Sequence, residues 1–386
     1  MFRTYRKVLV ISGLIFCLFS SVFAYSGGTG EPNNPYQIAT VSDWNDLMHS
    51  SADWNKNFIM TADVNLQGVT LTPVGNSTNK FTGVFDGNNH IIRNVDINMP
   101  ASYYVGLFGY IGSGGRVCKL GGENVRIIGY NYVGGLVGEN YYGTIAACYT
   151  TGSVTGTDTG PGYIGYIGGL VGWNLGTISA SYTRCTVTGD DYVGGLVGDS
   201  AGVVIDCYAM GAVFGGRCVG GLVGRNKGTV DRCYAAGTVD EGDYVGGLVG
   251  WNTDLNDVNT SFWDIETSGQ TTSAGGEGKT TAEMKTLSTF TPAGWDFDYT
   301  DGDAADWFIQ IDEYPILTWQ ISPADIYTDG RNNFRDFALF AQYWMRKDCA
   351  IYNNYCDWAD LNFDGVVDIN DLKEFMSYWL EEGIYN

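Results

Sequence analysis

A seven-residue stretch, Tyr-Val-Gly-Gly-Leu-Val-Gly, recurs along the middle of this chain and constrains its fold more than any other feature. Complete or altered copies stand at Tyr104–Gly109, Tyr132–Gly138, Ile167–Gly172, Tyr192–Gly198, Cys218–Gly224 and Tyr244–Gly250. Their central leucines, Leu107, Leu136, Leu170, Leu196, Leu222 and Leu248, are 29, 34, 26, 26 and 26 residues apart. A repeat of this length is typical of a solenoid, in which each unit buries its apolar face against its neighbours.

Each repeat continues with the same order of residues. Positions 140, 174, 200, 226 and 252 hold Asn or Ser, mostly with Gly close behind. Asn and Gly tolerate positive φ, so we expect a tight corner there. Short runs rich in Val, Ile, Thr and Tyr follow, and these cannot build a core alone, whereas stacked coils pair their backbones about 4.8 Å apart. The sequence therefore predicts a mainly β fold, a right-handed-type β-helix solenoid with coils of mostly 26 residues.

The repeat resembles the GLUG family, named for its Gly-Leu-x-Gly core, over roughly Tyr103–Thr260. Repeats of this kind look similar to those in large bacterial surface proteins and in the β-helical region of IgA-cleaving peptidases. The resemblance implies a secreted, surface or adhesion-type scaffold. It does not imply a peptidase, because the chain has no His-Glu-x-x-His.

Shared repeat positions predict columns of side chains. Cys118, Cys148, Cys207 and Cys233 should form an interior column, as buried free thiols or as disulfides. One tyrosine column holds Tyr103, Tyr132, Tyr166, Tyr192 and Tyr244, and another holds Tyr149, Tyr182, Tyr208 and Tyr234. We favour structural stacking of these rings over a sugar-binding platform. Asp191, Arg217 and Asp243 should lie in register as a charged column.

The N-terminal segment predicts export. Residues 1–24 read as a signal peptide, with Arg3, Arg6 and Lys7 ahead of the apolar run Val8–Phe19. The remaining chain has a net charge of about −25, since the segment removes three of 21 cations and none of the 43 acids. We expect a secreted or cell-surface bacterial protein that binds no nucleic acid and has no membrane span after signal removal.

The regions flanking the repeats predict terminal caps. Residues 25–102 should form an N-terminal cap and the first coils, with a short helix at Thr40–His49 that begins in a capping box between Thr40 and Asp43. Residues 103–260 form the GLUG-repeat β-helix, and 261–320 should cap its C-terminal end with aromatic and aliphatic bulk.

A twelve-residue loop near the C-terminus carries the clearest chemical motif. It runs from Asp360 to Asp371, with Gly365 at position six. Ca²⁺ prefers six or more oxygen ligands, which such a loop supplies from positions one, three, five, seven, nine and twelve. The predicted ligands are Asp360, Asn362, Asp364, the Val366 carbonyl, Asp368 and Asp371.

An earlier segment has the same frame in degenerate form. Its corresponding residues are Asp325, Asp329, Arg331, Asn333 and Asp336, with Tyr327 at position three, where a phenol is a poor ligand. Each loop leads into an apolar helix. Paired loop–helix halves over residues 322–382 resemble a dockerin, a small all-α, EF-hand-like domain. The resemblance implies Ca²⁺ binding and docking onto a cohesin-like partner, with loop positions ten and eleven, Phe334, Arg335, Ile369 and Asn370, helping to choose it. Separately, Cys349 and Cys356 could form a disulfide in an exported chain.

Three functions remain open from the sequence. The leading interpretation is a secreted, non-catalytic modular scaffold displayed through its calcium-ordered tail. A carbohydrate-active β-helix enzyme, either a polysaccharide lyase or a glycoside hydrolase, is the second, although the repeats offer few carboxylates and no catalytic residue is assigned. A module that binds extracellular or cell-surface polysaccharide is the third.

Overall fold

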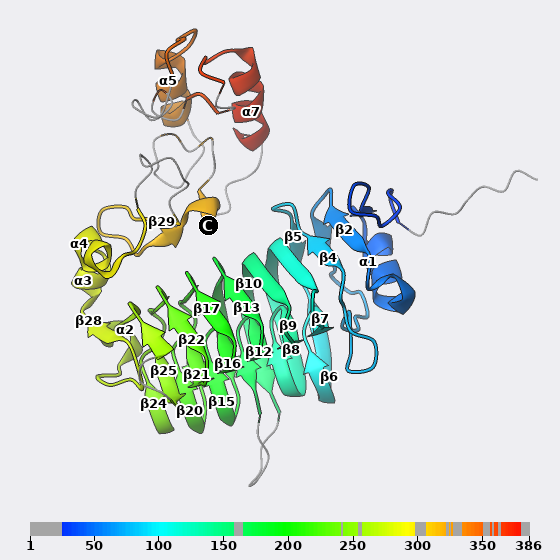
Figure 1. Cartoon of the computed structure of the whole chain (residues 1–386), viewed down its shortest axis with the longest axis vertical. Helices are drawn as coiled ribbons and strands as arrows, with labels where there is room; N and C mark the ends of the chain where they lie inside the picture. The colour runs from blue at the N-terminus through cyan, green and yellow to red at the C-terminus, as the bar shows by residue number, and fades with distance from the viewer. Residues whose placement is uncertain are drawn as a thin grey trace, which may run out of the picture.

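The chain winds into a β-solenoid of stacked coils (Figure 1). The computed structural model describes residues 25–157, 165–240, 242–253, 257–297, 306–321, 324, 326, 334–349, 356, 359–361 and 364–379. Within these ranges, every strand pairing between coils is parallel, as in β20 (Arg217–Gly220) against β24 (Asp243–Gly246). The predicted mainly β solenoid is therefore confirmed.

The strands fall into three hydrogen-bonded sets. The first coils contain β1 (Tyr36–Ile38), β2 (Asn57–Met60), β3 (Val64–Asn65), β4 (Val84–Asp86), β5 (Ile91–Arg93), β6 (Asp96–Val105), β8 (Arg116–Gly134) and β10 (Thr144–Gly156). The same 22-stranded set continues through β11 (Ile167–Gly168), β13 (Thr177–Ser179), β14 (Tyr182–Thr188), β15 (Asp191–Gly194), β17 (Val203–Ile205), β18 (Tyr208–Ala209), β19 (Val213–Phe214), β20, β22 (Thr229–Asp231), β23 (Tyr234–Ala235), β24, β26 (Val258–Asn259), β27 (Phe262–Asp264) and β28 (Glu277–Lys279). A six-stranded sheet holds β7 (Phe108–Ile111), β9 (Val137–Asn140), β12 (Val171–Asn174), β16 (Val197–Ser200), β21 (Val223–Asn226) and β25 (Val249–Asn252). Finally, β29 (Trp307–Phe308) pairs with β30 (Ile316–Leu317) in antiparallel fashion.

The repeated Gly-Gly-Leu places one leucine per coil in the core. All six central leucines are at most 1% exposed and belong to one apolar cluster. The second Gly of the motif is required because successive coils approach closely. A Cβ on Gly195 would lie 2.0 Å from the carbonyl oxygen of Gly221, and one on Gly221 would lie 2.1 Å from that of Gly247. Only glycine fits at this distance, so the motif fixes both the spacing and the stacking of the coils.

A tight corner follows the repeated Asn or Ser position, as the sequence predicted, for example between β12 and β13, but the Asn itself does not have a positive φ. Asn140, Asn174 and Asn226 are buried and have ordinary φ, and their amides form a ladder from coil to coil. Asn140 Nδ2 donates to Asn174 Oδ1 at 2.8 Å, and Asn226 Nδ2 donates to Asn252 Oδ1 at 3.1 Å. Positive φ occurs instead at the first residue of the heptamer, as at Tyr132. Tolerance of positive φ is therefore not why Asn stands at this position; its amide pairs with its copy in the next coil.

The tyrosine columns form, with one correction of register. Tyr149, Tyr182, Tyr208 and Tyr234 stack with ring centroids 4.9, 4.7 and 4.9 Å apart and nearly parallel planes. In the other column the ring that stacks on Tyr132 is that of Tyr104, at 4.8 Å, whereas Tyr103 pairs with Asn131. The heptamer copy beginning at Tyr104 lacks one Gly, and this displaced the predicted alignment by one residue.

The cysteine column is shifted at its first member. Cys118 pairs with Ala146, whereas Cys148 pairs with Leu120, so Cys118 does not share the column. The described solenoid cysteines are buried free thiols, which confirms that alternative over disulfides. Cys207 Sγ lies 3.1 Å from the carbonyl of Ile205 and acts as a donor to it. Ser181 Oγ donates to the carbonyl two residues back in the same way, at 2.7 Å. The column therefore selects a small side chain with a hydrogen-bond donor.

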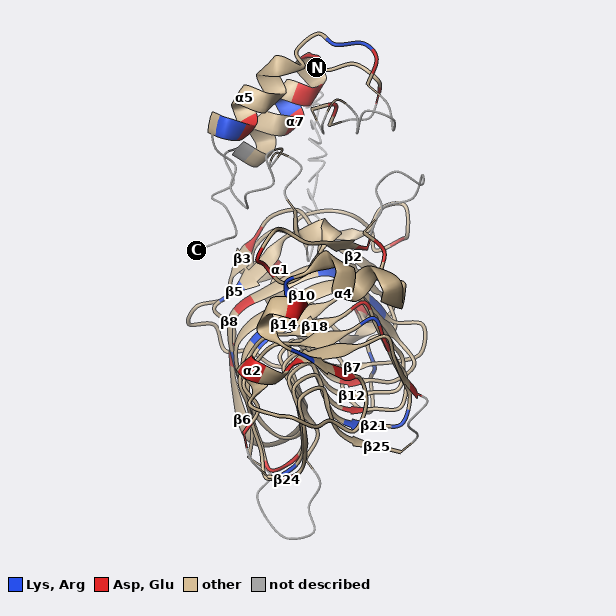
Figure 2. Ribbon diagram, turned by 90° about the vertical axis from the view of Figure 1, so that its left-hand side faces the viewer, with Lys and Arg blue, Asp and Glu red and all other residues tan. Residues whose placement is uncertain are grey.

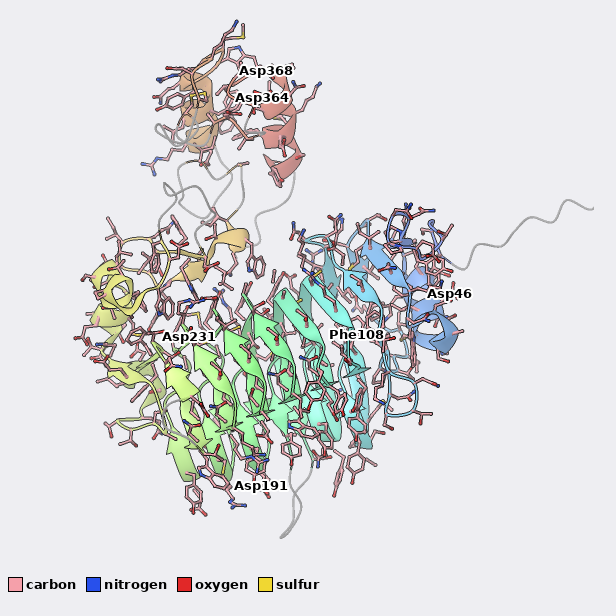
Figure 3. All side chains as sticks on the ribbon, in the orientation of Figure 1. Asp46, Phe108, Asp191, Asp231, Asp364 and Asp368 are labelled. Atoms are coloured by element: carbon pink, nitrogen blue, oxygen red, sulfur yellow. A yellow bond between two sulfur atoms is a disulfide. The ribbon has the colours of Figure 1, made fainter. Side chains whose placement is uncertain are left out.

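The predicted charge column is in register. Arg217 pairs with Asp191 on one side and with Asp243 on the other, and its Nη1 lies 3.8 Å from Asp191 Oδ1. Figure 2 shows acidic and basic residues together near β24, and Figure 3 labels Asp191 at the same rim.

We expect Arg217→Asp to lower the melting temperature, because it places three like charges in adjacent coils. Each lost exposed pair contributes only about 0–1 kcal/mol, so the effect should be modest. It should be larger in about 0.01 M salt, where the Debye length is about 30 Å, than in about 1 M salt, where it is about 3 Å. Arg217→Gln separates loss of the cation from added repulsion. Equal melting curves for all three proteins at low salt would contradict the column.

The N-terminal cap has the predicted helix. It is α1 (Val41–His49), with Thr40 as N-cap and a complete capping box with Asp43, whose Oδ2 accepts from the Thr40 backbone N–H at 2.8 Å. Burial opposes ionisation of Asp43, but the hydrogen bonds from Ala39, Ser26 and Thr40 prevail and lower its pKa. The short 3₁₀ helix η1 (Ser51–Asp53) follows it.

The C-terminal region differs from the predicted end cap. Only its first part, β27 and β28 with α2 (Ile265–Ser268), continues the stack. The remainder includes α3 (Thr281–Met284), α4 (Leu287–Phe290), η3 (Thr291–Ala293), β29, β30 and η4 (Thr318–Gln320). Its apolar side chains join a second apolar cluster with the buried tyrosine column. We call residues 281–297 and 306–320 the flank strap, because they cover the side of the solenoid as well as its end.

Long-range hydrogen bonds hold the flank strap in place. Tyr208 Oη donates to Gln320 Oε1 at 3.0 Å, Tyr234 Oη donates to the Pro315 carbonyl at 2.7 Å, and Trp319 Nε1 donates to the Ala180 carbonyl at 2.8 Å. Among the described residues, which exclude the first 24, no helix is long and apolar enough to cross a membrane.

Candidate functional site

Two helices after the flank strap form a separate unit with its own apolar cluster. They are α5 (Phe334–Gln342) and α7 (Ile369–Trp379). Phe340 and Phe375 are buried against each other, with ring centroids 5.1 Å apart. The two apolar helices predicted after the loops are therefore present.

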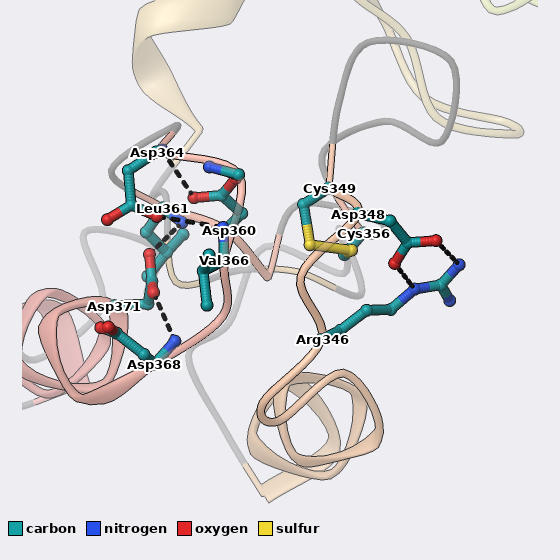
Figure 4. Close-up of a disulfide and its surroundings, with 11 residues drawn as sticks. Arg346, Asp348, Cys349, Cys356, Asp360, Leu361, Asp364, Val366, Asp368 and Asp371 are labelled. Carbon is teal, nitrogen blue, oxygen red and sulfur yellow. Dashed lines mark hydrogen bonds and ion pairs between the residues drawn. A yellow bond between two sulfur atoms is a disulfide. The ribbon is translucent and has the colours of Figure 1, made fainter.

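The described residues of the second loop include its glycine and the start of the helix that follows. Gly365, at position six, has a φ of +91°, which favours glycine. Helix α7 begins at position ten, so Asp371 lies in its first turn. Figure 4 shows the carboxylates of Asp360 and Asp371 turned into the loop. Asp360 Oδ2 accepts from Gly365 N at 2.9 Å, and Asp371 Oδ2 accepts from Asp368 N at 2.7 Å.

The acidic residues of this loop make a cation favourable there. Asp360 and Asp371 are both fully buried. Burial raises the pKa of Asp360, and the negative charges of Asp371 and Asp364 add to the shift. The donor types fit a hard cation such as Ca²⁺. Within the described part of the chain, however, no three acidic, His or Cys side chains are already grouped for a metal, and Asn362 lies outside that part.

The first loop lies almost entirely outside the described residues. Asp325, Asp329, Arg331 and Asn333 are among those not described. Asp336, its last position, is fully buried in the first turn of α5.

The residues predicted to help choose the partner are the first two residues of each helix. Phe334 is 81% exposed as the first residue of α5, and Ile369 is 52% exposed as the first residue of α7. Arg335 and Asn370, which follow them, are also exposed. The unit therefore presents one large apolar and one polar side chain at the start of each helix.

The Cys349–Cys356 disulfide is present, with Cα atoms 5.0 Å apart. The sequence did not predict that the segment after α5 pairs with the second loop, residues 360–371. Met345 N donates to the Val367 carbonyl at 2.8 Å, Val367 N to the Arg346 carbonyl at 3.0 Å, and Cys349 N to the Gly365 carbonyl at 3.2 Å. Backbone pairing of this kind leaves no pattern of side chains in the sequence. Figure 4 shows the disulfide beside the loop.

Comparison with known families decides the nature of the solenoid. The profile of the GLUG motif matches residues 129–155 and 215–240, two of the stacked coils. Coils of this β-solenoid therefore carry the GLUG motif.

Relatives of the GLUG coils include very long proteins. Halomucin from Haloquadratum walsbyi is 33% identical over 157 residues, which cover 38% of this chain and 2% of halomucin. A protein from Evansella cellulosilytica that is named as a Gly-rich membrane protein is 34% identical over 131 residues, which cover 32% of this chain and 15% of that protein. The chain thus spans only a small part of these relatives.

A solved structure shares the fold. It is a crystal structure of a Bacteroides ovatus protein assigned as an immunoglobulin A1 protease, with a TM-score of 0.58 and 21% identity over 77% of this chain and 96% of that one. At this identity the likeness concerns the fold alone.

The outer row of the six-stranded GLUG sheet was not singled out from the sequence. Its in-register members are Tyr110, Glu139, Trp173, Asp199, Arg225 and Trp251. They pack beside the Tyr104 column, and the Arg225 guanidinium lies 3.9 Å from the ring centroid of Tyr192. Asp199 is buried, and its negative charge is balanced by ion pairs with Arg225 and Lys227.

Glu139 is the unusual member of this row. It is 2% exposed, and burial raises its pKa to about 7, although a hydrogen bond to Tyr110 and the charge of Lys80 act in the opposite direction. Between pH 4.5, the ordinary pKa of this side chain, and about pH 7, the folded protein keeps a proton on Glu139 that the unfolded chain releases. The free energy of unfolding therefore falls as the pH rises through this window.

We expect Glu139→Gln to be more stable than the natural protein at about pH 8 and nearly equal to it at about pH 4.5. The difference should be about 1–3 kcal/mol, from 1.36 kcal/mol per pKa unit discounted for relaxation. Urea denaturation at both pH values measures it. Glu313→Gln, at an exposed position, is the matched control. A Glu139→Gln difference that does not change with pH would contradict this assignment.

Proposed function

We propose that this chain is an extracellular or cell-surface, non-catalytic modular protein whose GLUG solenoid is displayed through a dockerin-like tail. The tail, residues 322–382, is ordered by Ca²⁺ and docks onto a cohesin-like partner. Relatives named as a mucin and as a membrane protein support the location. The Cys349–Cys356 disulfide supports an oxidising compartment, and the signal peptide predicted at residues 1–24 agrees with export.

The exposed pair Phe334 and Ile369 is the observation that carries the docking proposal. A helix of a small monomeric unit normally turns such residues inward, yet here each is the first residue of its helix and lies mostly in solvent. Large apolar side chains ringed by polar residues are typical of the energetic centre of an interface. Other residues form the buried apolar cluster of the two-helix unit, among them Phe340 and Phe375.

The test is binding to a panel of purified cohesin modules in Ca²⁺ and in chelator. We expect one or more modules to bind only with Ca²⁺, and the double variant Phe334→Ser, Ile369→Ser to lose at least about tenfold in affinity. Phe214→Ser, which changes an exposed aromatic of the solenoid, is the matched control. Binding that is absent for the whole panel, or that survives the double variant, would refute docking through this face.

A further inference from the structure

The buried tyrosine column lacks one member, and a pocket lies at that place. Gly121 pairs with Tyr149 on one side and with Ile91 on the other, so its coil contributes no ring. The stack Tyr149–Tyr182–Tyr208–Tyr234 therefore begins at Tyr149. A Cβ at Gly121 would lie 2.6 Å from the ring of Tyr149, which leans over the glycine.

Three segments distant in sequence line this pocket. They are the turn of the first coils, the next coil together with the tyrosine column, and the end of the flank strap, with lining residues Asn89, Ile91, Lys119, Leu120, Gly121, Tyr149, Tyr182, Trp319 and Gln320. The cavity has a volume of about 60 Å³. One water needs about 10–15 Å³ of such space, so the pocket admits a group of only a few heavy atoms.

Aromatic rings form one wall and are held rigidly. The Trp319 ring centroid lies 5.8 Å from that of Tyr182 and 6.3 Å from that of Tyr149. Trp319 is fixed by its hydrogen bond to Ala180, and Tyr149 Oη donates to Glu123 Oε1 at 2.8 Å. Glu123 is itself paired with Arg93 at 3.0 Å. Rigid aromatic faces of this kind suit the apolar C–H face of a sugar ring.

The one charged side chain among the residues that line the pocket is positive. Asn89 contributes an amide, which binds hydroxyl groups, whereas the Gln320 amide is already bonded to Tyr208 and Leu317. Lys119 contributes the one charge, and no carboxylate lines the pocket, although the whole chain has 43 acidic residues against 21 basic ones. An anionic group is therefore favoured there over a neutral one. A free amino acid is not, because its ammonium group would find no carboxylate.

The geometry points to a binding site for the carboxylate end of a uronic acid, the terminal sugar of an acidic polysaccharide. The carboxylate and its adjoining ring carbons enter beside the Lys119 ammonium. The rest of the sugar ring stays at the mouth against Trp319, with its hydroxyls towards the Asn89 amide. A phosphate is a poorer fit, since it calls for several charged donors and gains nothing from the aromatic wall. This inference does not depend on the docking proposal.

The probe is sodium D-galacturonate added to the full mature chain, with D-galactose as the neutral counterpart. Saturation-transfer NMR and calorimetric titration measure binding. We expect galacturonate to bind more tightly than galactose, and Lys119→Gln to weaken galacturonate about tenfold, a loss typical of a charge-assisted hydrogen bond. Asn89→Gly should also weaken it, and glycine suits the φ of +62° at this position.

Lys347→Gln is the control, because it removes the same charge from an exposed site in the C-terminal unit. Since Lys119 is exposed, its replacement should leave the melting temperature unchanged. The site is refuted if galacturonate does not bind, if galactose binds equally well, or if Lys119→Gln binds galacturonate as the natural protein does.

Discussion

Replacing Leu222 with Ala should lower the free energy of unfolding by about 2–5 kcal/mol, the largest effect we expect from a single core change. Leu222 is fully buried and stacks between the leucines of the coils on either side. Neighbouring coils cannot close the resulting cavity, because glycines fix the distance between their backbones. Urea denaturation followed by circular dichroism measures the change.

Leu287→Ala is the matched control for this substitution. Leu287 is 45% exposed on α4, so its truncation should alter stability by no more than about 0.5 kcal/mol. If both variants shift the urea midpoint equally, the leucine column is not the core of the solenoid.

Calcium should convert the isolated tail, residues 322–382, from a poorly helical to a helical unit. Without the ion, the negative charges of Asp364 and Asp371 oppose that of Asp360, and burial also disfavours the charged form of Asp360. A bound cation removes this penalty, so its binding energy appears as folding energy. About sixty residues with a small apolar cluster are marginally stable alone. Far-ultraviolet circular dichroism with Ca²⁺, and then with chelator, measures the response.

Asp364→Ala should remove most of this response, whereas Asp329→Ala should remove less because Tyr327 already weakens the first loop. Asp348→Ala is the control: this exposed residue pairs with Arg346 outside the calcium loop. A tail that is equally helical with and without Ca²⁺ would show that the ion does not order it. The raised pKa of Asp360 further predicts weaker Ca²⁺ binding at acidic pH, since protons compete for that carboxylate.

Features that repeat were predictable from the sequence, since each coil tests the same hypothesis again. The leucine stack, the register of Arg217 with its aspartates, and the tyrosine columns all follow from residue spacing. Errors arose where a coil departs from the pattern: the heptamer copy at Tyr104 lacks one Gly, and Cys118 pairs with Ala146 and not with Cys148. A one-residue change in a turn is invisible until backbone pairing fixes the register.

Most features that do not repeat could not be predicted from the sequence. The flank strap binds through single contacts such as Tyr208 with Gln320, 112 residues apart, and Trp319 with Ala180, 139 residues apart. No period in the sequence marks such pairs, and the pocket at Gly121 depends on them. In the tail, the ligand spacing predicted the loop and Cys349–Cys356 predicted the disulfide. The pairing of Met345 with Val367 is between backbone groups and carries no residue signature.

The flank strap also decides how the protein would bear a mechanical load. A chain held by its tail while its solenoid meets a surface is pulled through residues 306–320, which lie between the two. Tension reaches the coils first through the side-chain anchors at Tyr208, Tyr234 and Ala180, and not through the last coil. These anchors sit on different coils, so the pull is shared among them. The strap would therefore detach before the backbone hydrogen bonds between coils open from the last coil. Its detachment would absorb part of the load on the solenoid.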